Sequence, residues 1–363
     1  MNQPLTTLPQ KRSKAPFIGL LLLALAIAGG MAWNLDRQRK AEALRRYKWG
    51  KIALPQRLAR VPARWSASTL ADRLEKSRKI RDAATFEAAA TQIGLTEAAP
   101  GGYLLPAVAG PLDVARVFKN GPTHEEVTFP EGFTAAQVAA RLRKNGFEGA
   151  ASVLQAAYPV GTPSPLEGRL FPDTYTLPLQ ASGTQLVQTM TERWKEEMAR
   201  LPRPFPTVDG KPLTEAQIVI LASLVEREAG SRAEMPLVAG VMVNRLRRPM
   251  RLQVDASIQY ARVLAERGHK SRLLFADLEI KSPFNTYQND GLPPTPICNP
   301  GAAALRAAAR PAKTDALFYV YSPKLKRHLF APDFEEHKRN IAVVRRERVQ
   351  LDRAAESEAE GSE

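Results

Sequence analysis

Two glutamates, Glu226 and Glu228, stand at the end of an apolar segment, where their carboxyl groups could act as general acid or base. Residues 218–225 are apolar on all sides of a helix, which is typical of a buried helix. A carboxyl group at the end of such a helix is poorly hydrated, and this favours its neutral form. A carboxyl that stays protonated near neutral pH is what a general acid requires.

The same two residues have a structural alternative. They could pair with Arg227, Arg232 or Arg245 at a solvated helix end. Periodicity alone favours this alternative, because carboxylates are seldom buried without a partner. Periodicity also does not decide between Glu226 and Glu228.

Sequence signals at both ends of this segment predict the helix that would position the two carboxyl groups. Thr214, with Gln217 three residues later, forms a capping box, and Gly230 can end the helix. We therefore expect a buried helix between residues 214 and 230.

Residues 166–175 form a turn-rich stretch with polar side chains that could bind a substrate. Glu167 and Tyr175 are candidate substrate-binding residues within it. The alternative is a plain loop in which the hydroxyl group of Tyr175 bonds Asp173.

Residues 244–255 contain four further candidate substrate-binding residues, Asn244, Arg245, Gln253 and Asp255. If the chain is extended here, the last two lie on one face. An amide and a carboxylate on one face suit sugar hydroxyl and acetamido groups. They suit a plain polar sheet face equally well.

Residues 282–301 are rich in proline, glycine and asparagine, which fix a loop rigidly. Asn285 and Tyr287 are candidate substrate-binding residues here, because rigid polar loops line the clefts of many enzymes. Cys298 lies in the same loop, but no histidine is close in sequence, so a thiol nucleophile has little support.

Composition restricts the cofactors and partners of the chain. The 363 residues carry a formal net charge of +15, which favours anionic partners such as nucleic acid, anionic lipid or acidic wall polymers. No helix-turn-helix or aromatic–basic stacking motif is visible, so we predict no nucleic-acid partner. The one cysteine and four histidines lack metal-ligand spacing, so we predict no metal and no cofactor.

The N-terminal region predicts a membrane anchor. Residues 15–33 carry no charged side chain and would span about 28 Å as a helix, close to one hydrocarbon core. A signal peptide cleaved near Ala26 and a buried core helix are the alternatives. We expect a cytoplasmic tail over residues 1–14, a transmembrane helix over 15–34 and a basic connector over 35–51.

An internal repeat follows the connector. Residues 61–67 are echoed by residues 128–135, so that Trp65 matches Phe133 and Ser66 matches Thr134. The register continues from residues 70–74 to residues 138–142. Each copy reads as a short strand, a turn and a helix capped by the serine or threonine.

Changes in composition divide the remainder of the chain. We expect a small α+β repeat region over residues 52–150, a mixed α+β catalytic domain over 151–351 and an acidic disordered tail over 352–363. The fold class is therefore α+β behind an N-terminal transmembrane helix.

Four segments, in order, resemble the YceG-like family of endolytic murein transglycosylases. They are residues 166–175 (LEGRLFPDTY), 222–228 (ASLVERE), 244–255 (NRLRRPMRLQVD) and 282–297 (SPFNTY with GLPPTPI). The second repeat copy is similar to the family's LysM-like subdomain. The first copy departs from the pattern, because it has Arg64 where the family usually has glycine, and this puts wall binding by that copy in doubt.

The resemblance implies cleavage of peptidoglycan glycan strands between N-acetylmuramic acid and N-acetylglucosamine, with 1,6-anhydro ends and without water. It implies that Glu226 is the catalytic acid and then base, with Glu228 as the fallback. It also implies a single-pass protein of the plasma membrane with an extracytoplasmic catalytic domain, which terminates nascent strands beside peptidoglycan synthases. The rival hypothesis is a membrane-anchored protein that binds peptidoglycan without cutting it.

Overall fold

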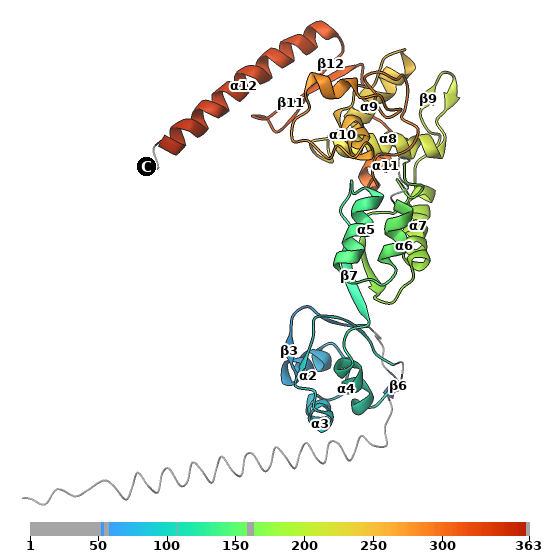
Figure 1. Ribbon diagram of the computed structural model, residues 1–363, viewed down its shortest axis with the longest axis vertical. Helices are drawn as coiled ribbons and strands as arrows, with labels where there is room; N and C mark the ends of the chain where they lie inside the picture. The colour runs from blue at the N-terminus through green and yellow to red at the C-terminus, as the bar shows by residue number, and fades with distance from the viewer. Residues whose placement is uncertain (1–51, 54–57, 107, 158–162, 361–363) are drawn as a thin grey trace, which may run out of the picture. The chain divides into compact units, whose positions relative to one another are not determined.

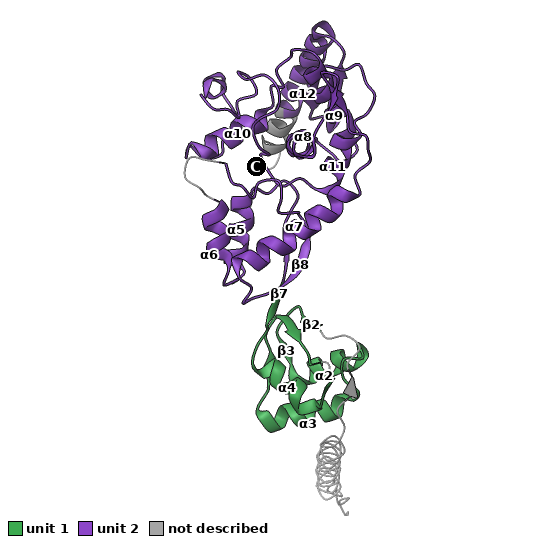
Figure 2. Cartoon of the chain, turned by 90° about the vertical axis from the view of Figure 1, so that its right-hand side faces the viewer, with its two compact units in different colours: residues 1–125 green, residues 126–363 purple. Residues whose placement is uncertain are grey.

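The computed structural model describes residues 52–53, 58–106, 108–157 and 163–360, and the chain forms two compact units, residues 1–125 and 126–363 (Figure 2). The predicted tail, anchor and connector of residues 1–51 lie outside the described residues. Within the described part of the chain, no helix is both long and apolar enough to cross a membrane.

The first unit is a small α+β fold. Strand β2 pairs antiparallel with β5, and Val61 lies opposite Gly101. Its core includes Phe118, whose ring contacts those of Phe86 and Tyr103. The elements are β1 (Ile52–Ala53), β2 (Leu58–Val61), β3 (Trp65–Ser66), α2 (Ala67–Lys76), α3 (Ala83–Ile93), β4 (Glu97–Ala98), β5 (Gly101–Leu104), β6 (Val108–Ala109) and α4 (Pro111–Lys119).

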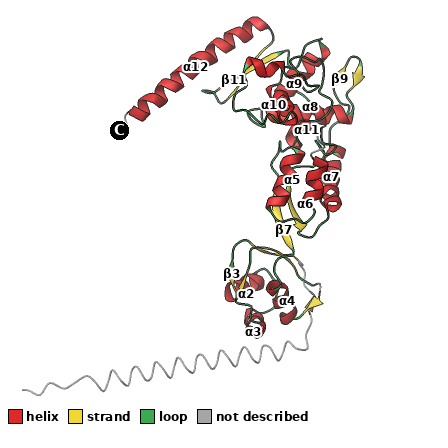
Figure 3. Cartoon of the chain, viewed as in Figure 1, coloured by secondary structure: helices red, strands yellow, loops and turns green. Residues whose placement is uncertain are grey.

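The second unit is mostly helical with short strands (Figure 3). Strand β7 (His124–Thr128) leads into it. The following elements are α5 (Ala135–Lys144), α6 (Ala150–Ala157), β8 (Thr174–Pro178), α7 (Gly183–Ala199), β9 (Thr207–Val208), β10 (Lys211–Pro212), α8 (Glu215–Glu228), α9 (Met235–Arg247), α10 (Asp255–Leu264), the 3-10 helix η1 (Phe275–Glu279), α11 (Ala302–Ala309), β11 (Phe318–Ser322), β12 (Arg327–Ala331) and α12 (Phe334–Glu360).

Helix α8 is the centre of the larger core of this unit. It contacts α9, α10 and α11, and Figure 1 shows these helices grouped in the same part of the unit. All of its residues from 218 to 225 are buried, and Thr214 forms the capping box with Gln217, as predicted. The helix ends at Glu228, two residues before Gly230. The segment therefore carries Glu226 and Glu228 in its last turn.

The predicted caps and buried helix faces of the two repeat copies are confirmed. Ser66 caps α2 and Thr134 caps α5, each by accepting a backbone N–H three residues later at 3.2 Å. The matched apolar positions are buried in both copies. Arg73 lies 5.9 Å from the centre of the Trp65 ring, and the equivalent Arg141 lies 5.1 Å from that of Phe133.

The predicted mixed α+β class is confirmed for the described residues, but two boundaries differ from the expectation. The units divide between residues 125 and 126, within β7, rather than after residue 150. The second repeat copy thus belongs to the larger unit. Helix α12 continues to Glu360, whereas the sequence predicts a disordered tail from residue 352; this stretch is rich in alanine and glutamate, which are good helix formers.

Candidate active site

Glu226 lies in the last turn of α8 and is half-buried. Its Oε2 atom accepts the N–H of Gly301 at 2.9 Å, and no other described group donates to its carboxyl. Gly301 is the N-cap of α11, so this hydrogen bond joins two helix ends. One carboxyl oxygen of Glu226 is therefore left for a ligand.

The turn of the second repeat copy lies beside Glu226. Gly132 has a φ of 79°, and a Cβ atom at this position would lie 3.5 Å from Cγ of Glu226. The neighbouring Glu131 accepts a hydrogen bond from Arg232 at 2.8 Å. Gly132 N–H in turn donates to the carbonyl of Asn299 at 3.0 Å.

Burial raises the pKa of the Glu226 carboxyl above its ordinary value, and the negative charge of Glu131 adds to this effect. The hydrogen bond from Gly301 and the positive charges of Arg232 and Arg227 act in the opposite direction but do not cancel it. The shift is toward the neutral acid, which is the direction that the apolar helix predicts.

Glu228 is more completely engaged by the protein. Its Oε1 atom accepts the N–H of Ala256 at 3.3 Å, and its Oε2 atom accepts the hydroxyl of Tyr319 at 3.1 Å. Burial raises the pKa of Glu228 to about 7, and the charge of Asp255 acts in the same direction. The pKa values of both carboxyl groups are thus raised, but of the two only Glu226 keeps an oxygen without a donor among the described residues.

The structure differs from the alternative in which the two glutamates form ion pairs with arginines at the helix end. Within the described residues, neither Glu226 nor Glu228 forms an ion pair with an arginine, and Arg232 pairs with Glu131 instead. Arg245 is buried and donates to three backbone carbonyls, of Leu317 and of residues 251 and 252, at 2.6–3.2 Å.

Two of the predicted residues meet beside Glu228. The hydroxyl of Tyr287 donates to Oδ1 of Asp255 at 2.5 Å, and Asp255 is exposed. Burial and this hydrogen bond raise the pKa of Tyr287. Gln253 is also exposed, but its φ of 52° and the start of α10 at Asp255 show that the segment is not extended.

Asn244 and Asn285 instead hold the backbone. Asn244 donates to the carbonyls of Thr314 and Ala316 at 2.8 and 3.1 Å. Asn285 is buried and donates to the carbonyls of residues 278 and 280, both at 2.8 Å. These amides fix the loops that surround the site.

Glu167 and Tyr175 are both buried. Glu167 accepts the N–H of Ala135 at 3.0 Å and the hydroxyl of Tyr260 at 3.2 Å, and burial raises its pKa to about 8. The Tyr175 hydroxyl donates to the carbonyl of Phe171 at 2.7 Å, and not to Asp173 as the loop alternative had it.

Sequence reasoning missed three residues that shape the surroundings of Glu226. Gly301 donates its N–H to Glu226, and Glu131 lies against Gly301. The buried side chain of Asn299 donates to the carbonyl of Phe133 at 2.9 Å and so joins the loop before α11 to the turn of the second repeat copy. The proline-rich loop was noted, but its polar members after Cys298 were not selected. Cys298 itself is buried, and burial raises the pKa of its thiol.

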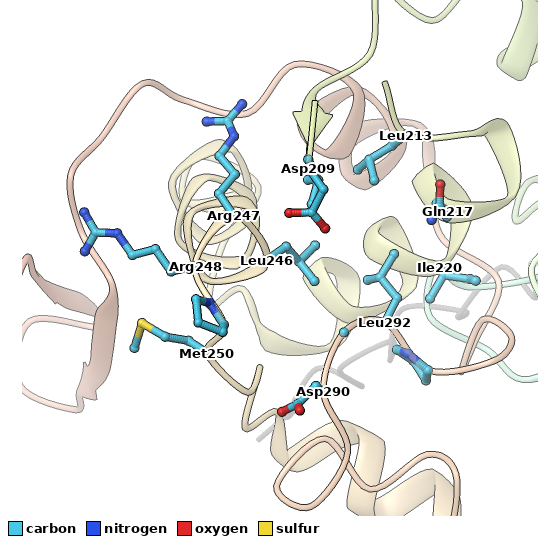
Figure 4. A pocket seen from close by; sticks show the side chains of 14 residues that line it. Asp209, Leu213, Gln217, Ile220, Leu246, Arg247, Arg248, Met250, Asp290 and Leu292 are labelled. Atoms are coloured by element: carbon cyan, nitrogen blue, oxygen red, sulfur yellow. The ribbon is translucent and has the colours of Figure 1, made fainter. Parts of the chain in front are cut away.

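A separate pocket of about 580 Å³ lies along the first half of α8 (Figure 4). Arg247, Arg248, Asp209 and Asp290 are among its charged lining residues, but Glu226 does not line it. Among the described residues, no group of three or more histidine, cysteine, aspartate or glutamate side chains could hold a metal ion.

Comparisons with known proteins agree on one family. The sequence model of the YceG-like family matches residues 59–343. An endolytic murein transglycosylase of Bacillus subtilis (strain 168) is 37% identical over 172 residues, which are 45% of this chain and 46% of that protein. One of Streptococcus pneumoniae is 28% identical over 361 residues, 89% of this chain and 64% of that protein. The chain thus spans about half to two-thirds of these relatives.

A crystal structure at 2.6 Å of a putative YceG-like protein from Listeria monocytogenes is also similar. It is 27% identical, with a TM-score of 0.48 over 80% of this chain and 98% of that one.

Proposed function

The chain belongs to the YceG-like family, and on that premise we propose that it is an endolytic lytic transglycosylase of peptidoglycan. It cleaves the glycan strand between N-acetylmuramic acid and N-acetylglucosamine and leaves 1,6-anhydro ends. The relatives named as endolytic murein transglycosylases support this activity and substrate.

The observation that carries the proposal is the state of Glu226. Its carboxyl is desolvated at the end of a buried helix, its pKa is raised, and one of its oxygens has no donor among the described residues. A neutral carboxyl with a free oxygen can donate a proton to a leaving group.

One carboxyl can serve both halves of the reaction. Glu226 first protonates the glycosidic oxygen as the bond from that oxygen to C1 breaks. The resulting carboxylate then takes the proton from the C6 hydroxyl of the same muramic acid as its oxygen bonds C1. Glycosidases generally use two carboxyl groups, but here the C6 oxygen replaces the second group or water as nucleophile.

We further propose the arrangement in the cell that the sequence favours. Residues 15–34 anchor the chain in the plasma membrane, with the catalytic unit outside the cytoplasm. The second repeat copy forms a LysM-like subdomain that holds the glycan. Cleavage ends the elongation of nascent strands, which makes peptidoglycan synthases natural partners.

Glu226→Gln tests the proposal, because the amide keeps the size of the side chain but cannot act as an acid. General acid–base catalysis contributes about 10²–10⁴-fold, so turnover should fall by at least about that factor. The melting temperature should stay or rise, since the amide lacks the cost of a buried carboxyl. Mass spectrometry of digested peptidoglycan measures the anhydro ends, and reducing ends in their place would mean hydrolysis.

Glu228→Gln is the matched control on the same helix turn. It should keep measurable anhydro-product formation, because Glu228 is occupied by Ala256 and Tyr319. If Glu228→Gln loses activity while Glu226→Gln keeps it, the assignment is shifted by two residues. If the wild type binds peptidoglycan but releases no product, the non-catalytic binding protein is the correct alternative.

A further inference from the structure

Glu131 lies directly over the backbone that contacts Glu226. A Cβ atom added to Gly301 would lie 2.0 Å from Oε1 and 2.3 Å from Cδ of Glu131. The Glu131 carboxylate therefore fills the space above Gly301, the residue whose N–H donates to Glu226. Gly301 has an ordinary φ of −78°, so its lack of a side chain serves this close approach and not an unusual backbone conformation.

Arg232 holds Glu131 in this place. Its guanidinium donates to Oε2 of Glu131 at 2.8 Å, while the side chain of Arg232 is 72% exposed and that of Glu131 is 29% exposed. The two Glu131 oxygens thus face different partners, one toward Gly301 and the other toward Arg232. A surface ion pair of this kind contributes little to the stability of a fold. Stability alone therefore does not explain why the pair lies beside Glu226.

We propose that Glu131 is a positioning residue for Glu226 and that Arg232 holds Glu131 in place. Together the two residues set the pH range over which Glu226 stays protonated. This inference rests on the proposed function, in which Glu226 must be an acid before it is a base. Glu131 is not the nucleophile in this scheme and need not touch the substrate.

The charges around Glu226 predict the direction in which each member acts. The Glu131 carboxylate raises the pKa of Glu226, and the Arg232 guanidinium lowers it. Arg227 on α8 also lowers this pKa, as does the Gly301 N–H from the loop before α11. Loss of the Glu131 charge and loss of the Arg232 charge should therefore have opposite effects, although each disrupts the same ion pair.

The opposite directions of these two effects distinguish an electrostatic effect on Glu226 from simple structural support by the ion pair. In Glu131→Gln the proton should leave Glu226 at lower pH than in the wild type, and in Arg232→Gln at higher pH. On the falling limb of the pH–rate profile, the two rates at one pH should change in opposite directions, by about twofold or more at low ionic strength. Glutamine preserves the volume of Glu131, and Arg232 is exposed enough for its variant to fold.

The test uses the full chain in two measurements. Carbon-13 NMR of labelled glutamate carboxyl groups follows the titration of Glu226, with Glu226→Gln identifying its signal, and needs no catalysis. The pH profile of anhydro-product formation reports the same group in turnover. Glu215→Gln is the matched control, because it breaks the Arg203–Glu215 surface ion pair at the other end of α8 and should leave both curves unchanged.

Opposite shifts in the NMR titration confirm the inference. Shifts in the same direction, or no shift in either variant, overturn it and leave only a structural ion pair. The NMR result stands whether or not the wild type makes anhydro products. Missing products with opposite shifts would reject the proposed function alone, and normal products without opposite shifts would reject the positioning role alone.

Discussion

The two copies of the strand–turn–helix repeat share their register but differ in what their turns and helix starts contact. In the first copy, Arg64 pairs with Glu97 and the N–H of Ala67 donates to the carbonyl of Thr96 at 2.9 Å, all within the first unit. In the second copy, Gly132 stands in place of Arg64, and the N–H of Ala135 donates to Glu167.

The difference shows how one local design can serve two purposes. The first copy is closed on its own small core, whereas the turn of the second copy is part of the surroundings of Glu226. Glycine at the turn is required by the second arrangement, because a φ of 79° is disfavoured for other residues. The duplicated sequence thus predicts a common fold but not a common role.

Deleting each copy should give the largest contrast. A chain without residues 52–125 should keep its turnover of short soluble glycans and most of its sedimentation with insoluble wall, because the first copy has Arg64 in place of the glycine of the second copy. A chain without residues 52–150 should lose both, because it also lacks Glu131 and the helix α5, whose Val138 and Leu142 are buried in the core of the catalytic unit. Loss of short-glycan turnover in the first deletion, with the fold retained, would disprove this division of labour.

The sequence contained enough information for the elements and the repeat, because these depend on local signals. Capping residues and apolar spacing determine a helix and its buried face within a few residues of chain. The buried α8 and the matched caps Ser66 and Thr134 were predicted on this basis, and the structure confirms them.

The partners of polar side chains were much harder to predict. Asn244, Arg245 and Asn285 were selected for their chemistry, yet the structure has all three donating to backbone carbonyls. An amide or guanidinium that fixes a loop has the same spacing in sequence as one that faces a substrate. Glu131 and Gly301 were missed because 170 residues of chain separate them and only the fold brings them together.

A smaller effect should appear in the pH dependence of stability. It comes from Glu167, which accepts the N–H of Ala135 at the start of α5. The pKa of Glu167 is about 8 in the folded chain, above its ordinary 4.5, so the folded state holds a proton that the unfolded state releases. Its contribution to stability is present below about pH 4.5 and is lost as pH rises through about 8. At about 1.4 kcal/mol per pKa unit, the change can reach several kcal/mol.

Glu167→Gln should flatten this decline, because an amide does not titrate. The hydroxyl of Tyr260 can turn to accept from the new NH₂ group, and the amide oxygen can keep the N–H of Ala135. Denaturant unfolding of both proteins between pH 4.5 and 8 measures the difference. An unchanged slope in the variant would mean that Glu167 is ionised when folded. In the first copy the equivalent N–H, that of Ala67, donates to the backbone carbonyl of Thr96, which does not titrate.

The smallest effect should come from single glycines, one in each unit. Gly121 in the first unit and Gly132 in the second both have positive φ, 90° and 79°, so alanine at either position should cost about 1 kcal/mol. Calorimetry should show a fall of about 4–8 °C in the melting of the small unit for Gly121→Ala, and of about 2–4 °C in that of the large unit for Gly132→Ala.

Only the variant in the second unit should also change catalysis. A Cβ atom at Gly132 would contact Cγ of Glu226 and Cδ of Arg227, each at 3.5 Å, whereas one at Gly121 would meet nothing within 4 Å. Neither contact is a clash, so the strained turn should shift rather than collapse and should reduce turnover by less than about tenfold. Equal turnover in both variants, with the expected losses of stability, would show that the turn of the second copy lies beside Glu226 without helping to position it.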